Sequence, residues 1–105
     1  MFDMKKLIRP MDFCVIKGKK LNKDGFFKGD LVFVAGTKLL PSNAKDPYVQ
    51  RIYMICERTT KAGYVDHSNM YLMDPRSLTK VTDERQEELT ELLSGQIEDE
   101  GEGVQ

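Results

Sequence analysis

Two cysteines and one histidine carry the side chains best suited to nucleophilic, redox or metal chemistry in this 105-residue chain. Cys14 and Cys56 lie among apolar neighbours, far from any C-x-x-C spacing, so we expect two buried, reduced thiols. The alternatives are a disulfide, which in small secreted domains belongs to a denser cysteine framework, and a zinc site, which usually needs paired ligands. His67 is flanked by Asp66 and Ser68, but successive strand side chains face opposite ways, so adjacency builds no Ser-His-Asp triad.

Nucleotide-binding and metalloprotease motifs are also missing from the sequence, which contains no P-loop, dinucleotide-binding glycine motif or H-E-x-x-H. We therefore expect a protein that is not an enzyme, with no catalytic residues, no cofactor and no metal ligands. The carboxylates that could serve as acids or bases are scattered through the sequence, and only folding could bring two of them together.

The charge of the chain is divided between two segments. From Val81 to the C-terminus there are nine acids and one base, a net charge of -8, whereas residues 1–80 carry +7. Such asymmetry points to a body that faces a polyanion, to an acidic tail with its own partner, or to both. The simpler interpretation is a solvated acidic helix that follows a mildly basic domain.

Membrane insertion and secretion are not expected. The longest apolar run is Leu31-Val32-Phe33-Val34-Ala35, far short of the ~20 residues of a membrane span. The first residues lack the apolar region and small-residue cleavage site of a secretory signal. We expect a cytoplasmic protein with no membrane partner.

Short apolar runs separated by turn residues predict five or six short strands between residues 11 and 81. Apolar residues on both faces of the run 31–35 suggest a small closed barrel or a covered sheet. Ile52, Met54 and Cys56 alternate with their neighbours and are expected to face the core. The stretch 41–47, with a proline at each end, is predicted to be a loop without strand or helix. Residues 1–10 are interpreted as an N-terminal arm.

The C-terminal segment changes to a helical period. Thr82 or Asp83 can cap a helix, Gln86 occupies the capping-box position after Asp83, and Gly95 is a natural stop. The leucines at 89, 92 and 93 form a narrow stripe that packs on its own domain or pairs with a second copy or a partner helix. We predict an acidic amphipathic helix over 82–95, a disordered acidic tail over 96–105, and a monomer or weak dimer formed through this helix.

Two stretches resemble SH3-like small β-barrel domains. Phe27-Lys28-Gly29-Asp30-Leu31-Val32-Phe33-Val34 is similar to the glycine-aspartate turn that precedes the first barrel strand. Residues 70–81 are similar to the closing strand, single 3₁₀ turn and short last strand. The resemblance covers about residues 27–81 and implies a mainly β (α+β) fold, with a small barrel over 11–81. Members of this fold bind proteins or nucleic acids or serve structural roles, and because this chain has no tryptophan we transfer no binding residues from them.

The first functional hypothesis is a non-catalytic interaction module, a small accessory or regulatory protein that docks on a larger protein assembly. A phage-encoded modulator of a host complex fits this description. Tyrosine and arginine dominate interface hot spots, and helix leucines can pair with a partner. The candidate protein-binding residues are Tyr48, Arg51, Tyr53, Leu89, Leu92 and Leu93.

The alternative hypothesis is nucleic-acid binding through a basic face of the barrel. Lysines neutralise phosphates and aromatic rings stack on bases, and both residue types cluster in one stretch. In this version the acidic tail acts as an internal competitor. The candidate residues are Lys17, Lys19, Lys20, Lys23, Phe26, Phe27 and Lys28.

Overall fold

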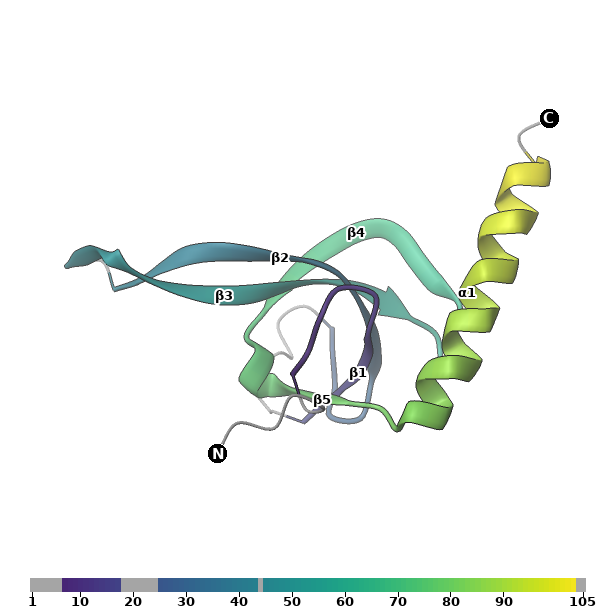
Figure 1. Ribbon diagram of the computed structural model, residues 1–105, viewed down its shortest axis with the longest axis horizontal. Coiled ribbons are helices and arrows are strands. Elements are labelled where there is room, and N and C mark those ends of the chain that lie inside the picture. The colour runs from purple at the N-terminus through teal and green to yellow at the C-terminus, as the bar shows by residue number, and fades with distance from the viewer. Residues whose placement is uncertain (1–6, 18–24, 44, 104–105) are drawn as a thin grey trace.

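The computed structural model describes residues 7–17, 25–43 and 45–103. Its elements are β1 (Phe13–Ile16), β2 (Leu31–Asn43), β3 (Asp46–Thr59), β4 (Val65–Met73), the 3₁₀ turn η3 (Pro75–Ser77), β5 (Leu78–Lys80) and α1 (Asp83–Gly103). The strands form one antiparallel sheet in the order β4-β3-β2-β1-β5 (Figure 1). The predicted mainly β, α+β class with a single C-terminal helix is confirmed.

The prediction of a closed barrel is wrong. β4 and β5 stand at opposite edges of the described sheet and do not pair with each other. The run 31–35 is apolar on both faces because the sheet is covered on both faces, which was the other interpretation of that pattern. Val32 and Val34 belong to one buried cluster, whereas Phe33 belongs to a second cluster that includes two leucines of α1.

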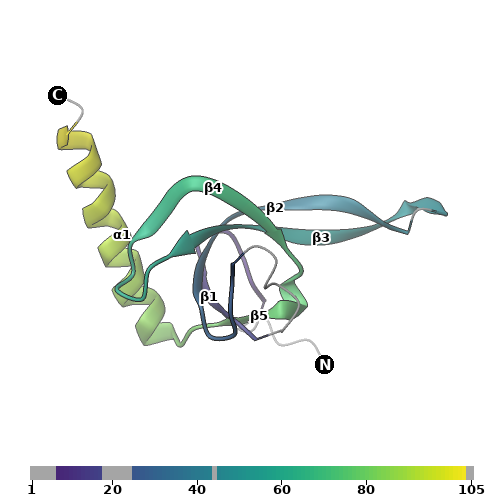
Figure 2. The ribbon, with the colours of Figure 1, turned by 180° about the vertical axis from the view of Figure 1, so that it is seen from behind.

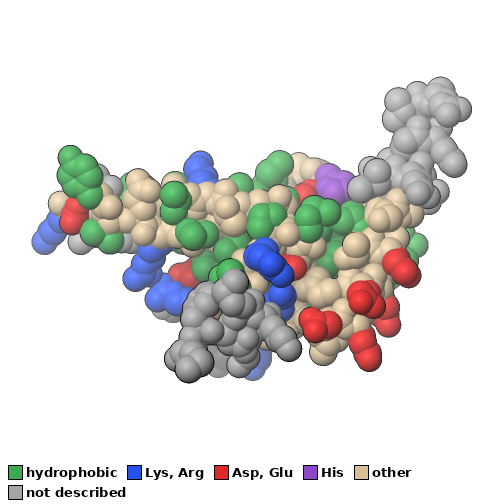
Figure 3. All heavy atoms as spheres, in the orientation of Figure 1, with side chains coloured by type: hydrophobic (Ala, Val, Ile, Leu, Met, Phe, Trp, Pro, Cys, Tyr) green, Lys and Arg blue, Asp and Glu red, His purple; other side chains and the backbone are tan. Residues whose placement is uncertain are grey.

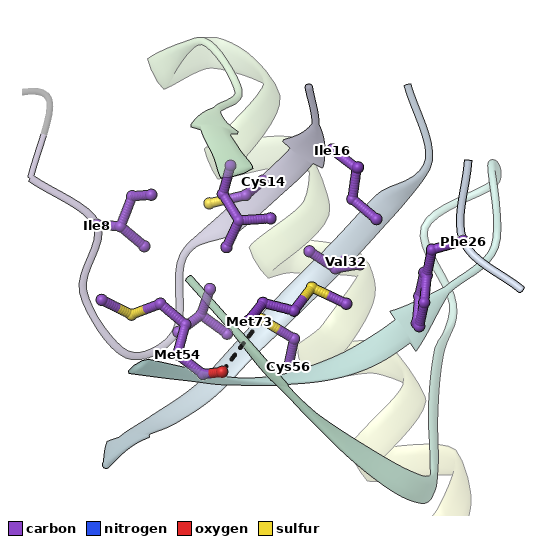
Figure 4. Packing of buried hydrophobic residues seen from close by; sticks show 10 residues of the cluster. Ile8, Cys14, Ile16, Phe26, Val32, Met54, Cys56 and Met73 are labelled. Atoms are coloured by element: carbon purple, nitrogen blue, oxygen red, sulfur yellow. Dashed lines mark hydrogen bonds between the residues drawn. The ribbon is translucent and has the colours of Figure 1, made fainter. Parts of the chain in front are cut away.

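The first buried cluster collects side chains from all five strands. Figure 4 shows it around Val32, Met54 and Cys56, with the Sγ of Cys56 3.8 Å from the carbonyl oxygen of Met54. Ile8 also packs here, so residues 7–10 of the predicted N-terminal arm belong in part to the core, while residues 1–6 lie outside the described residues. Both cysteines are buried and free, which confirms the prediction of reduced thiols.

The second buried cluster joins the helix to the opposite face of the sheet. Its buried residues are Phe13, Phe33, Val65, Leu89 and Leu93, with the rings of Phe13 and Phe33 5.0 Å apart. Leu89 and Leu93 are spaced i, i+4, so they lie on one face of α1. The helix therefore packs on its own domain through two of the three leucines of the predicted stripe.

Two glutamine side chains fix α1 to the sheet at points ten residues apart. The amide oxygen of Gln86 accepts a hydrogen bond from the backbone N–H of Phe13 (2.8 Å), and its NH₂ group donates to the Phe13 carbonyl (2.8 Å). Gln96 makes the same pair of bonds to Val65, at 3.0 and 2.7 Å. Gln86 and Gln96 lie on either side of Leu89 and Leu93 along one face of the helix. The apolar contact is therefore flanked at each end by hydrogen bonds from a glutamine side chain to the backbone of the sheet.

The helix is longer than predicted. It begins after Thr82, whose Oγ1 accepts from the backbone N–H of Arg85 at 3.3 Å, and it continues through Gly95 to Gly103. The predicted stop at Gly95 and the predicted disorder of 96–103 are therefore wrong, and residues 104–105 lie outside the described residues. A single helical glycine costs only about 1 kcal/mol, and the bonds of Gln96 to β4 hold the helix just beyond it.

The turn between β3 and β4 reaches the helix closely because residue 63 is glycine. Its φ is +103°, a left-handed conformation, and a Cβ there would lie 2.7 Å from Cδ2 of Leu89. The next residues begin β4, which is a single strand over Val65–Met73. η3 and β5 lie where the sequence predicted a single 3₁₀ turn and a last strand.

The predicted loop at 41–47 is the largest error in the sequence-based interpretation. β2 runs to Asn43 and β3 begins at Asp46, and Pro41 pairs with Gln50 across a long hairpin. Proline is tolerated in a strand at a sheet edge or a bulge. Both conditions hold here, because β2 and β3 pair only with each other at this distance from the body and a register shift falls between Pro41 and Asn43.

Candidate protein-binding surface

The outer part of the β2–β3 hairpin, residues 35–53, projects from the body as a two-stranded ribbon, which we call the arm (Figures 1 and 2). β1 pairs with β2 only as far as Phe33, and β4 pairs with β3 only from Met54 onward. Among the described residues no third strand covers the arm. An isolated two-stranded hairpin is marginally stable in water, so the arm depends on its base for its structure.

Large apolar side chains on the arm face solvent. Leu39 and Ile52 are cross-strand partners and are 59% and 53% exposed, and Tyr48, near the tip, is 92% exposed. Val49 is exposed as well. Ile52 was expected to face the core, and this is wrong because the core ends at Met54, two residues closer to the body.

The arm is also basic. It carries Lys38, Lys45 and Arg51 against Asp46, a net charge of +2. Near the tip, the carboxylate of Asp46 makes a local hydrogen bond, in which its Oδ1 accepts from the backbone N–H of Tyr48 at 3.1 Å. Figure 3 shows the contrast on one face of the molecule: Lys and Arg side chains lie on the arm and the adjoining body, and most of the Asp and Glu side chains in view gather on the helix.

The predicted protein-binding residues fall into two groups. Tyr48 and Arg51 are exposed on the arm, and Tyr53 is half-buried where the arm joins the body. Leu89 and Leu93 are buried against the sheet, so they are not available to a partner, and this part of the expectation is corrected. Leu92 alone of the three leucines is partly exposed.

The arm residues Leu39, Val49 and Ile52 were not among the predicted contacts. Val49 and Ile52 follow Pro47, and Leu39 precedes Pro41. Placing both prolines within strands would have included all three residues in one hairpin. The pairing of Leu39 with Ile52 is a long-range feature that local patterns do not contain.

Only some of the predicted nucleic-acid-binding residues are exposed in the part of the chain that the structure describes. Lys17, Phe27 and Lys28 are exposed, whereas Lys19, Lys20 and Lys23 lie outside the described residues. Phe26 is buried, which corrects its expected role as a stacking platform. Its ring is already occupied, with the guanidinium of Arg58 4.0 Å from the ring centroid and the ring of Tyr71 packed edge-on at 4.9 Å.

A buried carboxylate and the single histidine meet on the sheet, a contact that the sequence did not predict. Oε2 of Glu57 lies 2.6 Å from Nδ1 of His67, and the Glu57 side chain is almost completely covered. The pairing of β3 with β4 is irregular here, since the register shifts between the pairs Arg58–Asp66 and Cys56–Tyr71. The pair thus links β3 to the outward-bowed stretch of β4.

The hydroxyl beside His67 is not poised as a nucleophile. Oγ of Ser68 donates to Oδ1 of Asp66 at 2.6 Å. This bond and that from the Ser68 backbone N–H lower the pKa of Asp66. Among the described residues no three His, Cys, Asp or Glu side chains lie close enough together to hold a metal ion. Among the described residues this arrangement supplies no acid–base–nucleophile set.

The two thiols are shielded from reaction. Burial is the main cause that raises the pKa of both Cys14 and Cys56 to about 12. Because the thiolate is the reactive species, neither sulfur is a nucleophile at neutral pH.

No protein-family model, curated protein or solved structure matches this chain. In the part of the chain that the structure describes, none of the helical residues form a stretch long and apolar enough to cross a membrane. We therefore infer the function from the properties of the exposed surface.

Proposed function

We propose that the protein is a non-catalytic interaction module that docks on another protein through the arm. The observation that carries the proposal is the cross-strand pair Leu39–Ile52, two aliphatic side chains exposed together on a ribbon that projects from the body. Exposed apolar surface of this kind marks interaction sites in natural proteins. Tyr48 and Arg51 add the side chains that most often dominate interface energetics.

The partner surface follows from the chemistry of the arm. A net charge of +2 and a row of aliphatic and tyrosine side chains fit a partner with acidic residues around an apolar cleft. Both strands of the arm also have free outer edges among the described residues, so a partner strand can add to the ribbon by main-chain hydrogen bonds.

The resemblance to SH3-like domains and the cytoplasmic location remain proposals. The first is supported by the position of η3 between β4 and a short last strand, and the second by two free, buried thiols. An accessory or regulatory role on a larger assembly, including that of a phage-encoded modulator, is consistent with a small domain whose distinctive surface is a docking arm.

The test compares an arm variant with a matched body variant. The arm variant is Leu39→Ser with Ile52→Ser, and the control is Phe27→Ser with Met70→Ser, since Phe27 and Met70 are exposed apolar residues on the body. Each immobilised chain is used to capture proteins from nuclease-treated extract of the source cells. Loss of one anchor worth ~2 kcal/mol weakens binding by about 30-fold, and loss of both by up to roughly 1,000-fold.

The outcome separates the arm from the rest of the surface. We expect the wild-type chain and the control to retain the same proteins and the arm variant to lose them. Equal capture by the arm variant and the wild-type chain, or capture of nucleic acid alone before nuclease treatment, would contradict the proposal.

Nucleic-acid binding is the second candidate function, favoured by the exposure of Phe27 beside Lys28 and Lys17. Removing the acidic segment is not a clean test of the competitor hypothesis, because Leu89 and Leu93 are part of the core. We suggest Glu87→Gln, Glu88→Gln and Glu91→Gln instead, which keep the helix and remove three exposed charges. Tighter binding of a single-stranded oligonucleotide at low salt would support competition, and unchanged affinity would reject it.

A further inference from the structure

A hollow of about 500 Å³ lies on α1, at the end of the molecule opposite the arm. Tyr64, Leu92, Gly95 and Gln96 line it together with Arg85, Glu88 and Glu91. Tyr64 and Leu92 are both partly exposed, and a Cβ at Gly95 would meet nothing within 4 Å, so the hollow is open and offers apolar surface as well as polar groups.

Acidic side chains outnumber basic ones at the hollow. Glu88 and Glu91 line it directly, and Glu84 and Glu87 lie exposed on the same helix. Arg85 is already engaged, because its guanidinium donates to Oε2 of Glu88 at 3.0 Å and to the Lys61 carbonyl at 3.4 Å. An occupant that matches this surface carries positive charge around an aromatic or aliphatic anchor.

The arm has this complementary chemistry. The ribbon presents Leu39 and Ile52 on one face and Lys38 and Arg51 on the other, and Lys45, Tyr48 and Val49 are exposed near its tip. Within one molecule the arm cannot fill the hollow, because the arm and the helix lie at opposite ends of a molecule 51 Å long and the arm extends away from the helix (Figures 1 and 2). The contact therefore requires two copies of the chain.

We propose that the arm of one copy docks in the hollow on α1 of a second copy. This inference rests on the proposed function, because it names a surface that the arm binds. The arm and the hollow are different patches, so each contact is heterologous, and it leaves a second arm and a second hollow to be filled by a further copy or reciprocally within a dimer. Charge attraction between the exposed groups makes the association sensitive to salt.

Charge reversal on each side gives a test with an internal rescue. The helix-reversed chain carries Glu88→Lys and Glu91→Lys, the arm-reversed chain carries Lys38→Glu and Arg51→Glu, and the doubly reversed chain carries all four. The control, Lys17→Glu with Lys28→Glu, makes the same charge change as the arm reversal at exposed positions on the body. Sedimentation velocity at low salt over a concentration series measures association, and far-UV circular dichroism checks that each chain is folded.

We expect the average mass of the wild-type chain and of the control to rise with concentration, and to fall again when salt is raised. Each singly reversed chain should associate about tenfold more weakly or not at all, and the doubly reversed chain should recover association. A wild-type chain that is monomeric at every concentration up to its solubility limit, or singly reversed chains that associate like the wild type, would overturn the proposal.

The same variants separate this inference from the proposed function. The helix-reversed chain keeps an intact arm, so it should still capture the proteins retained by the wild-type chain. If it captures them while the wild type proves monomeric, self-association is wrong and the docking arm stands. If the arm variant Leu39→Ser, Ile52→Ser captures and self-associates normally, both fail.

Discussion

Leu89 and Leu39 are the same residue type in opposite circumstances. Leu89 is 0% exposed beneath the sheet, in a contact that glutamine side chains flank on both sides, whereas Leu39 is 59% exposed on the arm. Burial of a leucine side chain stabilises the folded state by about 1.5–3 kcal/mol. Leu89 makes this contribution, whereas Leu39 makes little of it because its side chain is mostly exposed. The difference indicates that the helix contact maintains the fold and that the arm is available to a partner.

The largest expected effect is from truncating the buried leucine. Leu89→Ala should lower the free energy of unfolding by about 2–5 kcal/mol, because it leaves a cavity between α1 and the sheet. Leu39→Ala should change it by less than about 0.5 kcal/mol, as at other exposed positions. Urea denaturation of the two variants measures both, and similar losses would abolish the distinction between the two regions.

The close approach of the β3–β4 turn to the helix can be tested with a pair of glycines. Gly63 and Gly29 both have positive φ, +103° and +92°, but a Cβ meets Leu89 at 2.7 Å in the first case and nothing within 4 Å in the second. Gly29→Ala should cost about 1–2 kcal/mol from backbone strain alone, and Gly63→Ala about 1–3 kcal/mol more from overpacking. Equal losses in thermal or urea unfolding would show that the turn and helix are not in tight contact.

The side-chain hydrogen bonds of Gln86 allow the body and the arm to be compared through a polar residue type. Gln86→Ala removes both hydrogen bonds to the part-buried backbone of Phe13 and should cost about 1–3 kcal/mol. Gln50→Ala, at an exposed position on the arm, should cost less than about 0.5 kcal/mol. If Gln86→Ala is as mild as Gln50→Ala, water replaces the bonds and α1 is held by its leucines alone.

The smallest effect concerns the thiols of the core. Burial raises the pKa of Cys14 and Cys56 from 9.0 to about 12, so the folded chain keeps thiol protons that the unfolded chain releases as pH rises above 9. The stability that they contribute is therefore complete below that pH and is lost above it, by about 0.8 kcal/mol per thiol between about pH 8 and about pH 9.5. The variant Cys14→Ala, Cys56→Ala should show a correspondingly flatter decline in unfolding free energy, and an identical decline would mean that the thiols are not shielded.

Local features of the fold were predictable, and those that depend on distant pairing were not. The run 31–35, the 3₁₀ turn at Pro75 and the start of the helix follow from side chains within a few residues of each other. The bonds of Gln86 and Gln96 join residues 73 and 31 positions apart in the sequence, and no local pattern specifies them.

The arm was missed for the same reason. Pro41 and Pro47 carry a strong local turn signal, and the pairing of two long strands on either side of them outweighed it. Of the candidate contacts, Tyr48 and Arg51 could be chosen by residue type, but the exposure of Leu39 and Ile52 depends on where the body ends, which only the folded chain defines.

Amide hydrogen exchange of the free protein tests the division between body and arm most directly. We expect backbone amides between Thr37 and Tyr53 to exchange far faster than those of β1 and of Leu31–Val34, because the arm opens without disturbing either buried cluster. Protection of the arm amides equal to that of β1 would show that the ribbon unfolds only with the whole domain, and would contradict its proposed role as a separate docking element.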